Sequence, residues 1–277
     1  MRTVRFISAL TIAAGCLFVS LWSSELSATN SQTAPKTVQV SITANANVLI
    51  KNADGRRIGV DFSTGKFINE ISDARLIDSE SITPFVLPYD QAGKPYTIMV
   101  TGKTEVTAPA NLSMTGPGFV VGARMLPIRS GLIHTVTISA NGSTVSFTSS
   151  QDGEMPILFM TFQTDRTKPS YRFEIGAASL SAGKILSLEL NSAVGRLTVK
   201  SSDPKQLKLS IQVRRTNPGG SRDTFSHRDT SFISGYDYAL DFGSWDGKSD
   251  IRFCQRLSPD DWICPALKNE APANPLN

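Results

Sequence analysis

The sequence predicts an all-β fold with two tandem antiparallel β-sandwich domains after a signal peptide. Three observations carry this prediction: an uncharged apolar segment near the N-terminus, short runs with an apolar residue at every second position, and turn residues between those runs, roughly every 8 to 12 positions. An alternation of this kind places every other side chain on one face of a strand, whereas an amphipathic helix needs a period of about 3.6.

The first 28 residues have the order of a secretory signal peptide. Arg2 and Arg5 are followed by residues 6–22 without a charge and then by a polar stretch. The small residues Ser27 and Ala28 predict cleavage after Ala28. Two alternatives remain open at this stage: a retained membrane anchor, because the apolar run is only just short of the ~20 residues that span a bilayer, and a lipoprotein in which Cys16 becomes the lipidated first residue.

A polar leader, residues 29–37, precedes the first predicted sandwich domain, residues 38–163. Alternating runs begin at Val38, at Tyr96 and at Leu132. Asn141 and Gly142 separate two further runs, and this pair predicts a hairpin with a type I′ turn, which needs positive φ at both central residues.

Residues 164–170 form the predicted linker, because they are polar and contain Pro169. The alternation resumes in residues 171–255, the second predicted domain. Residues 256–277 contain four prolines and predict an irregular C-terminal tail. The alternative to two sandwiches is one continuous barrel, since a single β domain can reach this length.

The cysteines fit an exported protein. Removal of the signal peptide leaves Cys254 and Cys264, which predict a disulfide in an oxidising compartment, with two free thiols as the alternative. We therefore expect a secreted protein, or one located in the periplasm or at the cell surface, with no integral membrane span in the mature chain.

The amount and distribution of charge argue against a nucleic-acid-binding protein. The formal net charge of +4 becomes +3 in the mature chain, because Arg2, Arg5 and Glu25 leave together. Acidic and basic residues are interspersed, apart from a denser basic stretch at residues 205–228. Within it Arg214 and Arg215 are candidate ligand-binding residues, together with the aromatic Trp245.

No catalytic residue is assigned from the sequence. The chain has no Gly-x-Ser-x-Gly motif, and its two histidines are too far apart to form a short metal-binding pair. His134 is in phase with apolar neighbours, which predicts a packed histidine with a backbone partner. His227 lies in a polar segment and is expected at the surface.

The oxygen-rich turn that contains Asp54 and Asp61 is a candidate Ca²⁺ site. The competing interpretation is that Asp54 and Gly55 form a hairpin turn and that Asp61 caps the next turn. The second interpretation is preferred, so no cofactor is expected.

Several short motifs resemble modules of uncharacterised secreted and cell-surface bacterial β-sandwich proteins. In the first half these are Asp-x-x-Arg-x-Gly-x-Asp at residues 54–61, Thr64-Gly65, Asn69-Glu70-Ile71, and the strand that carries Pro95, Tyr96, Val100 and Gly102. In the second half they are Tyr171-x-Phe173 and the closing stretch at residues 241–247. The resemblance implies an exported β-sandwich protein and carries no established activity.

These observations predict a non-catalytic exported binding or scaffolding protein of the cell envelope or extracellular space. Its partner is unknown, and an envelope glycan or another surface protein fits best. The alternative is a secreted carboxylate-dependent hydrolase that acts on carbohydrate or peptide, for which paired carboxylates across a cleft would be the signature.

Overall fold

The computed structural model describes residues 37–43, 45–77, 83–105, 108–153, 155–163, 165–233, 235–258 and 261–270. All of them belong to one compact unit, residues 35–277. The predicted signal peptide, Cys16, the polar leader up to residue 36 and the last seven residues lie outside the described residues.

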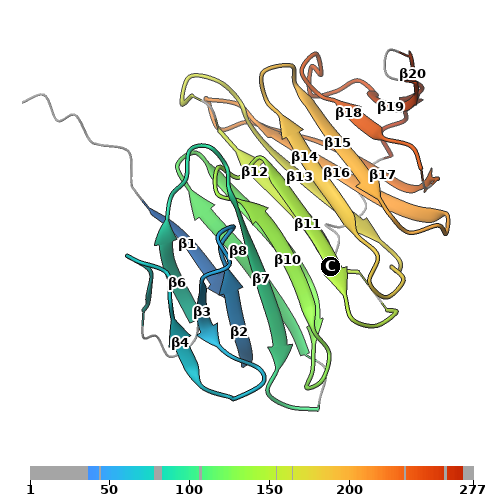
Figure 1. The fold of residues 1–277 in the computed structure, drawn as a ribbon. Helices are drawn as coiled ribbons and strands as arrows, with labels where there is room; N and C mark the ends of the chain where they lie inside the picture. The colour runs from blue at the N-terminus through green and yellow to red at the C-terminus, as the bar shows by residue number, and fades with distance from the viewer. Residues whose placement is uncertain are drawn as a thin grey trace, which may run out of the picture. The chain divides into compact units, whose positions relative to one another are not determined.

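The described chain is all-β and its strands form two antiparallel sheets, so the predicted all-β antiparallel sandwich class is confirmed (Figure 1). In spatial order, sheet A consists of β17 (Arg222–Phe232), β16 (Leu207–Thr216), β13 (Ser170–Ala177), β12 (Ile157–Phe162), β9 (Phe119–Ile128), β8 (Ala108–Gly116), β1 (Thr37–Ile42), β6 (Thr83–Pro88) and β5 (Arg75–Leu76). Sheet B consists of β20 (Asp261–Ile263), β19 (Ile251–Ser258), β18 (Tyr238–Asp241), β15 (Arg196–Ser201), β14 (Leu186–Asn191), β11 (Thr144–Ser149), β10 (His134–Ser139), β7 (Pro95–Gly102), β2 (Ala46–Lys51), β3 (Arg57–Val60) and β4 (Phe67–Asn69), with β21 (Ala266–Leu267) beside β19.

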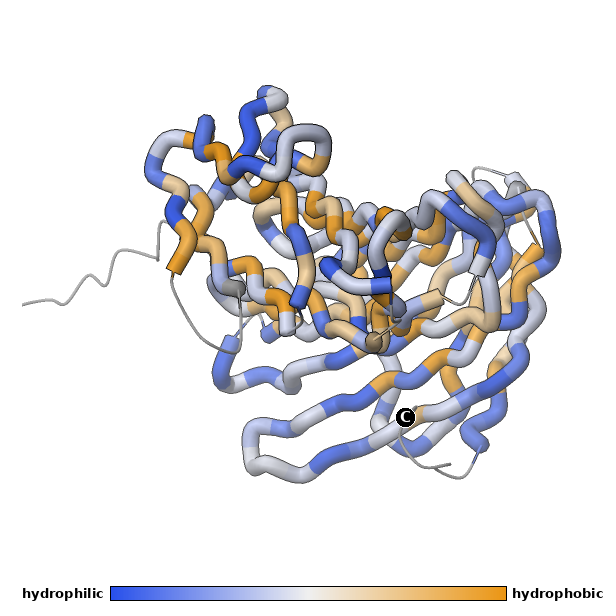
Figure 2. Tube along the Cα trace, turned by 90° about the horizontal axis from the view of Figure 1, so that it is seen from below, coloured by the Kyte–Doolittle hydropathy of each residue, from blue (hydrophilic) through white to orange (hydrophobic). Residues whose placement is uncertain are grey.

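The hydrophobic core lies between the two sheets and takes alternate side chains from both. Figure 2 shows this as hydrophobic and hydrophilic segments that alternate along the strands. In β16, for example, Leu209, Ile211 and Val213 are buried in the core. Rings from opposite sheets meet there: the centroid of Phe232 on β17 lies 4.4 Å from that of Tyr238 on β18. This packing buries the apolar area that stabilises a sandwich.

Both sheets continue across the predicted domain boundary at residues 164–170. In sheet A, β12 pairs with β13, and Leu158 lies opposite Ile175. In sheet B, β11 pairs with β14, and Val145 lies opposite Leu188. The two predicted strand sets are therefore joined edge to edge in each sheet.

The hairpin at Asn141–Gly142 is present, between β10 and β11, but its turn is not type I′. Gly142 has a φ of 72°, whereas the non-glycine residues with positive φ in the described chain are Asp73, Met125 and Asp229. The amide of Gly142 donates to Ser139 O, and Asn141 Oδ1 accepts from Ser143 N. Asn141 therefore supports the turn through its side chain and leaves the left-handed conformation to Gly142.

The expectation of an irregular tail at residues 256–277 is corrected in part. β19 continues to Ser258, and β20 and β21 both pair with it. Pro259 and Pro265 interrupt this segment in the sequence, which therefore shows no long alternating run.

Candidate functional site

The outward face of sheet A is basic. Among the described outward positions that pair across strands, one is a carboxylate, Glu174. The register shift of β17 also leaves Arg228 and Asp229, one charge of each sign, unpaired opposite Ser210. The cationic side chains on the same face are Arg75, Arg124, Arg172, Lys208, Arg214 and Arg222. An array with this imbalance produces a positive field over a broad, regular surface, which attracts anionic partners. We call it the basic face.

Glu174 organises the centre of the basic face. Its side chain is only 3% exposed although it points away from the core. Glu174 Oε1 accepts from Arg172 Nε at 2.7 Å and from Arg124 Nη1 at 2.8 Å. Charge-assisted hydrogen bonds of this length fix the positions of two guanidinium groups while one carboxylate balances only one of them.

Phe159 and Gln212 are the cross-strand neighbours of Glu174. Phe159 is opposite Glu174 on β12, and Gln212 is opposite it on β16. The guanidinium of Arg172 lies 4.7 Å from the centroid of the Phe159 ring, which is a cation–π contact. Both neighbours are buried, so the side chains around Glu174 pack closely on the outward side of sheet A.

Arg214 and Arg215 lie on opposite sides of β16, because successive side chains of a strand alternate. Arg214 is on the basic face, directly opposite Arg172. The side chain of Arg215 points to the other side, where its Nη1 donates to Asp246 O at 2.8 Å and lies 3.9 Å from Asp223 Oδ2. Of these two predicted ligand residues, Arg214 thus lies on the outward face, and Arg215 holds the loop after β18.

Trp245, the third predicted ligand residue, is buried with 5% of its surface exposed. Its Nε1 donates to Ser249 O at 2.9 Å, and its ring meets Phe225 edge-on. The neighbouring Asp246 Oδ1 accepts from the amides of Lys248 and Ser249, and these bonds lower the pKa of Asp246 to about 2. The ring therefore covers the edge of the core and offers no exposed stacking surface.

Asp61 is occupied by its own turn. Its Oδ1 accepts from the hydroxyl and the amide of Ser63, and its Oδ2 lies 3.5 Å from Arg57 Nη1. The Ser63 hydrogen bonds, and then Arg57, lower the pKa of the Asp61 carboxyl. Within the described ranges, no three His, Cys, Asp or Glu side chains gather closely enough to hold a metal ion.

Asp54 lines a different feature, an open depression of about 230 Å³ beside the β2–β3 turn. Asp90, Arg56, Lys94 and Tyr96 line it as well. Tyr96 donates its hydroxyl proton to Pro88 O at 2.8 Å. Burial, followed by the negative charges of Asp90 and Asp54, raises the pKa of Tyr96 to about 12. The hydroxyl is thus kept protonated and bonded to the backbone.

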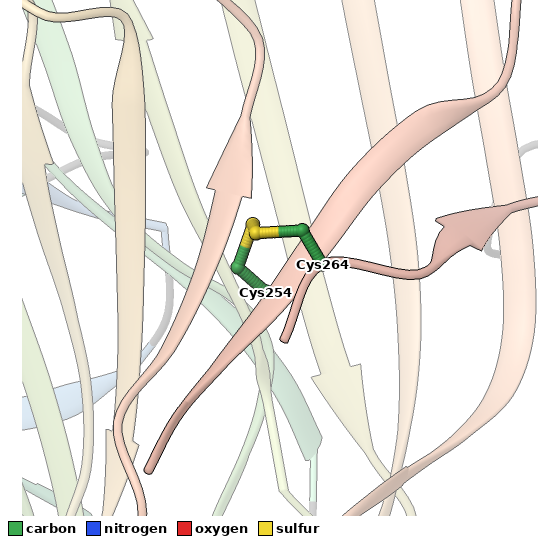
Figure 3. Close-up of a disulfide and its surroundings, with 2 residues drawn as sticks. All are labelled: Cys254 and Cys264. Carbon is green, nitrogen blue, oxygen red and sulfur yellow. A yellow bond between two sulfur atoms is a disulfide. The ribbon is translucent and has the colours of Figure 1, made fainter. Parts of the chain in front are cut away.

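The predicted disulfide is present: Cys254 on β19 is bonded to Cys264, just after β20 (Figure 3). Cys254 is buried, whereas Cys264 is exposed. The predicted setting of His134 is also confirmed, since its Nε2 bonds to Pro127 O on the facing sheet. No helix among the described residues has the length and apolar character needed to cross a membrane.

The chain was compared with family models, curated proteins and solved structures. None of them matches it. The residues that sequence reasoning missed are Arg124, Phe159, Arg172 and Glu174. The alternating order of Arg172, Phe173, Glu174 and Ile175 signalled a charged outward face on β13, but nothing in the sequence indicated the partner Arg124 fifty positions earlier.

Proposed function

We propose that the chain is an exported, non-catalytic binding protein whose basic face takes an anionic polymer of the cell envelope or extracellular space. The observation that carries the proposal is the charge imbalance of that face, six cationic side chains against the single buried carboxylate Glu174. A flat sheet face repeats its side chains about every 4.8 Å across strands and about 6.6 Å along them. This regular spacing suits a ligand with repeated charges better than a single small molecule.

The ligand chemistry follows from the side chains. Guanidinium groups present planar donors that match phosphate, sulfate or carboxylate oxygens, and five of the six cations are arginines. A polyanionic glycan, with phosphate, sulfate or uronate groups, fits these donors. Export is supported by the signal-like N-terminus and by the disulfide.

The direct test is binding of the mature chain to immobilised heparin, a sulfated glycan, with neutral dextran as the control. We expect retention on heparin that weakens as salt rises, because exposed charges are screened. The double variant Arg172→Gln/Arg214→Gln should bind about tenfold or more weakly, an effect of about 1.4 kcal/mol. A matched variant, Lys51→Gln/Arg252→Gln, removes two charges from sheet B and should bind like the parent. Equal losses in both variants would contradict a specific basic face.

A carboxylate-dependent hydrolase is the second candidate, and one observation favours it: Asp54 and Asp90 line the same depression. The opposing observation is that Asp90 Oδ1 already accepts from Ala92 N at 2.8 Å. A screen for release of reducing sugars and of peptides decides between the two. Turnover that is lost in Asp54→Asn and Asp90→Asn, but not in Asp73→Asn, would replace the binding proposal.

A further inference from the structure

β17 is an edge strand of sheet A, and residues from the C-terminal end of the chain cover its open side. The side-chain amide of Asn269 bonds to this edge as the backbone of a neighbouring strand would. Its Oδ1 accepts from Ser226 N at 3.1 Å, and its Nδ2 donates to Thr224 O at 3.3 Å. The edge groups of β17 that would otherwise be free to pair with another chain are thereby occupied.

Glu270 and Lys268 extend this cover. Glu270 N donates to Ser226 O at 2.9 Å, and Glu270 Oε2 accepts from Arg228 N at 3.2 Å. His227 Nδ1 lies 3.0 Å from Lys268 O. These contacts are therefore directional hydrogen bonds along the strand edge.

The covering segment starts from the other sheet. Pro265 O accepts from Phe253 N, Leu267 on β21 pairs with Ile251, and Asn269 N donates to Asp250 Oδ1 at 3.0 Å. Residues 265–270, which we call the clasp, thus connect β19 of sheet B to β17 of sheet A. They close one open side of the sandwich.

The disulfide limits where the clasp can go. Cys264 immediately precedes the clasp and is bonded to Cys254 on β19 (Figure 3), so the start of the clasp is tethered to β19 of its own copy. Without this bond, and once β20 separates from β19, the six residues that join Ser258 to Pro265 can extend over about 20 Å. That reach allows the clasp to leave its own edge.

We propose that, once the disulfide is reduced, the clasp exchanges between two copies of the chain and each β17 edge is covered by the clasp of the partner copy. A second copy is the fitting occupant, because it supplies the same donors and acceptors that the edge already uses. Reduction by a dithiol converts the disulfide to two thiols while the reagent is oxidised to its own disulfide, so electrons and protons balance. Exchange of an identical element is a known low-cost route to a dimer. The proposal is independent of the basic face.

The test is the mass of the full mature chain in solution by size exclusion with light scattering, with and without dithiothreitol. We expect a monomer when oxidised and a doubled mass after reduction, and the doubled mass without reductant in Cys254→Ser/Cys264→Ser. Adding Asn269→Ala and Glu270→Ala to that variant should restore the monomer, because the clasp then loses its side-chain hydrogen bonds to β17 in either copy and keeps only the bond of Glu270 N and its pairing with β19.

Exchange itself is read from two differently tagged preparations that are mixed after reduction, where co-purification of the two tags is expected. A reduced protein that stays monomeric overturns the proposal. So does a dimer that persists in the variant with Asn269 and Glu270 replaced, since its contact would lie elsewhere. Hydrogen exchange at the amides of Ser226 and Arg228 provides a second measurement on the parent chain: both should remain protected in the reduced dimer, and loss of their protection contradicts a clasp in trans.

Discussion

Arg172 and Arg214 lie directly opposite each other on β13 and β16, with both side chains on the outward face of sheet A. Like charges at directly opposite positions of an antiparallel pair destabilise the pairing. Arg172 is balanced by Glu174, at 2.7 Å. Within the described part of the chain, no hydrogen bond or ion pair is found for the guanidinium of Arg214. A bound anion between the two arginines would relieve their repulsion.

Arg214→Gln should therefore stabilise the free protein and weaken its binding. We expect the free energy of unfolding to rise by about 0.2–1 kcal/mol, because the repulsion with Arg172 is removed. Chemical denaturation measures this change, and heparin binding measures the loss of affinity. Arg252→Gln on sheet B is the control and should leave both quantities near the parent values. A destabilised Arg214→Gln protein would show that Arg214 supports the fold.

Glu174→Gln should destabilise the protein, since two guanidinium groups would lose the carboxylate between them. A loss of about 1–3 kcal/mol is expected for a buried partner of charge-assisted bonds. Glu189→Gln is the matched control, because Glu189 is 58% exposed and meets Lys200 only at 3.5 Å. It should change stability by less than about 0.5 kcal/mol. Equal effects in the two variants would refute an organising role for Glu174.

The faces of β16 could be predicted from the sequence, because Leu207, Leu209, Ile211 and Val213 alternate without interruption. β17 could not. Its core residues Phe225 and Phe232 are separated by an odd number of positions, since the register shifts opposite Ser210, and this shift breaks the period of two. The polar segment around His227 therefore showed no strand pattern although it forms a long edge strand.

The basic face was only half predictable, for a related reason. Alternation places Arg214 and Glu174 on outward positions, but the pairing register decides which residues stand beside them. Arg124 lies within reach of Glu174 because β9 and β13 both pair with β12, one on each side. Such long-range order is set by how the two sheets assemble and is not encoded in any local run.

His134 should make stability fall as the pH is lowered. Its ring is 1% exposed, its Nε2 is bonded to Pro127 O, and its Nδ1 has no hydrogen-bond partner in the described structure. Burial lowers the pKa of His134 below 6.5, although the Pro127 bond opposes this shift. Below pH 6.5 the unfolded chain thus binds more protons than the folded one, so the free energy of unfolding decreases as the pH falls.

Denaturation at pH 7 and pH 5 measures this dependence. His134→Gln keeps a donor for Pro127 O and cannot titrate, so the difference between the two pH values should shrink in that variant. His227→Gln, which removes the other histidine, is the control and should retain most of the difference. A pH dependence that follows His227 instead would show that the buried ring is not its source.

Met125→Gly should stabilise the protein by up to about 1 kcal/mol, because the left-handed strain that it relieves, about 1–2 kcal/mol, exceeds the entropy that glycine costs on folding, about 0.5–1 kcal/mol. Met125 has a φ of 56° in the bulge of β9, where β8 and β9 shift register, and its side chain is 45% exposed. Glycine adopts this conformation without strain, and little packing is lost. Met125→Ala keeps the Cβ and serves as the control, with no gain expected. A rise of the melting temperature in the Gly variant alone would support the argument, and equal melting temperatures would contradict it.

The last prediction concerns the two halves of the chain. The fragment of residues 168–270 should fold by itself, because it supplies strands to both sheets and an aromatic core between them. β13, β16 and β17 come from sheet A, and β14, β15, β18 and β19 from sheet B. The ring centroids of Phe173 and Phe242 are 4.8 Å apart, and those of Phe232 and Tyr238 are 4.4 Å apart. All four rings belong to the fragment.

Separation has a cost at two edges. β13 loses β12, and β14 loses β11, so each edge exposes unpaired backbone groups. Phe162 is removed as well, and its ring contacts Tyr171, Phe173 and Phe242 in the intact chain. We therefore expect a cooperative melt at a lower temperature than that of the whole protein. A fragment without a cooperative transition would mean that the continuous sheets form one folding unit, because the strand set then depends on its neighbours across residues 164–170.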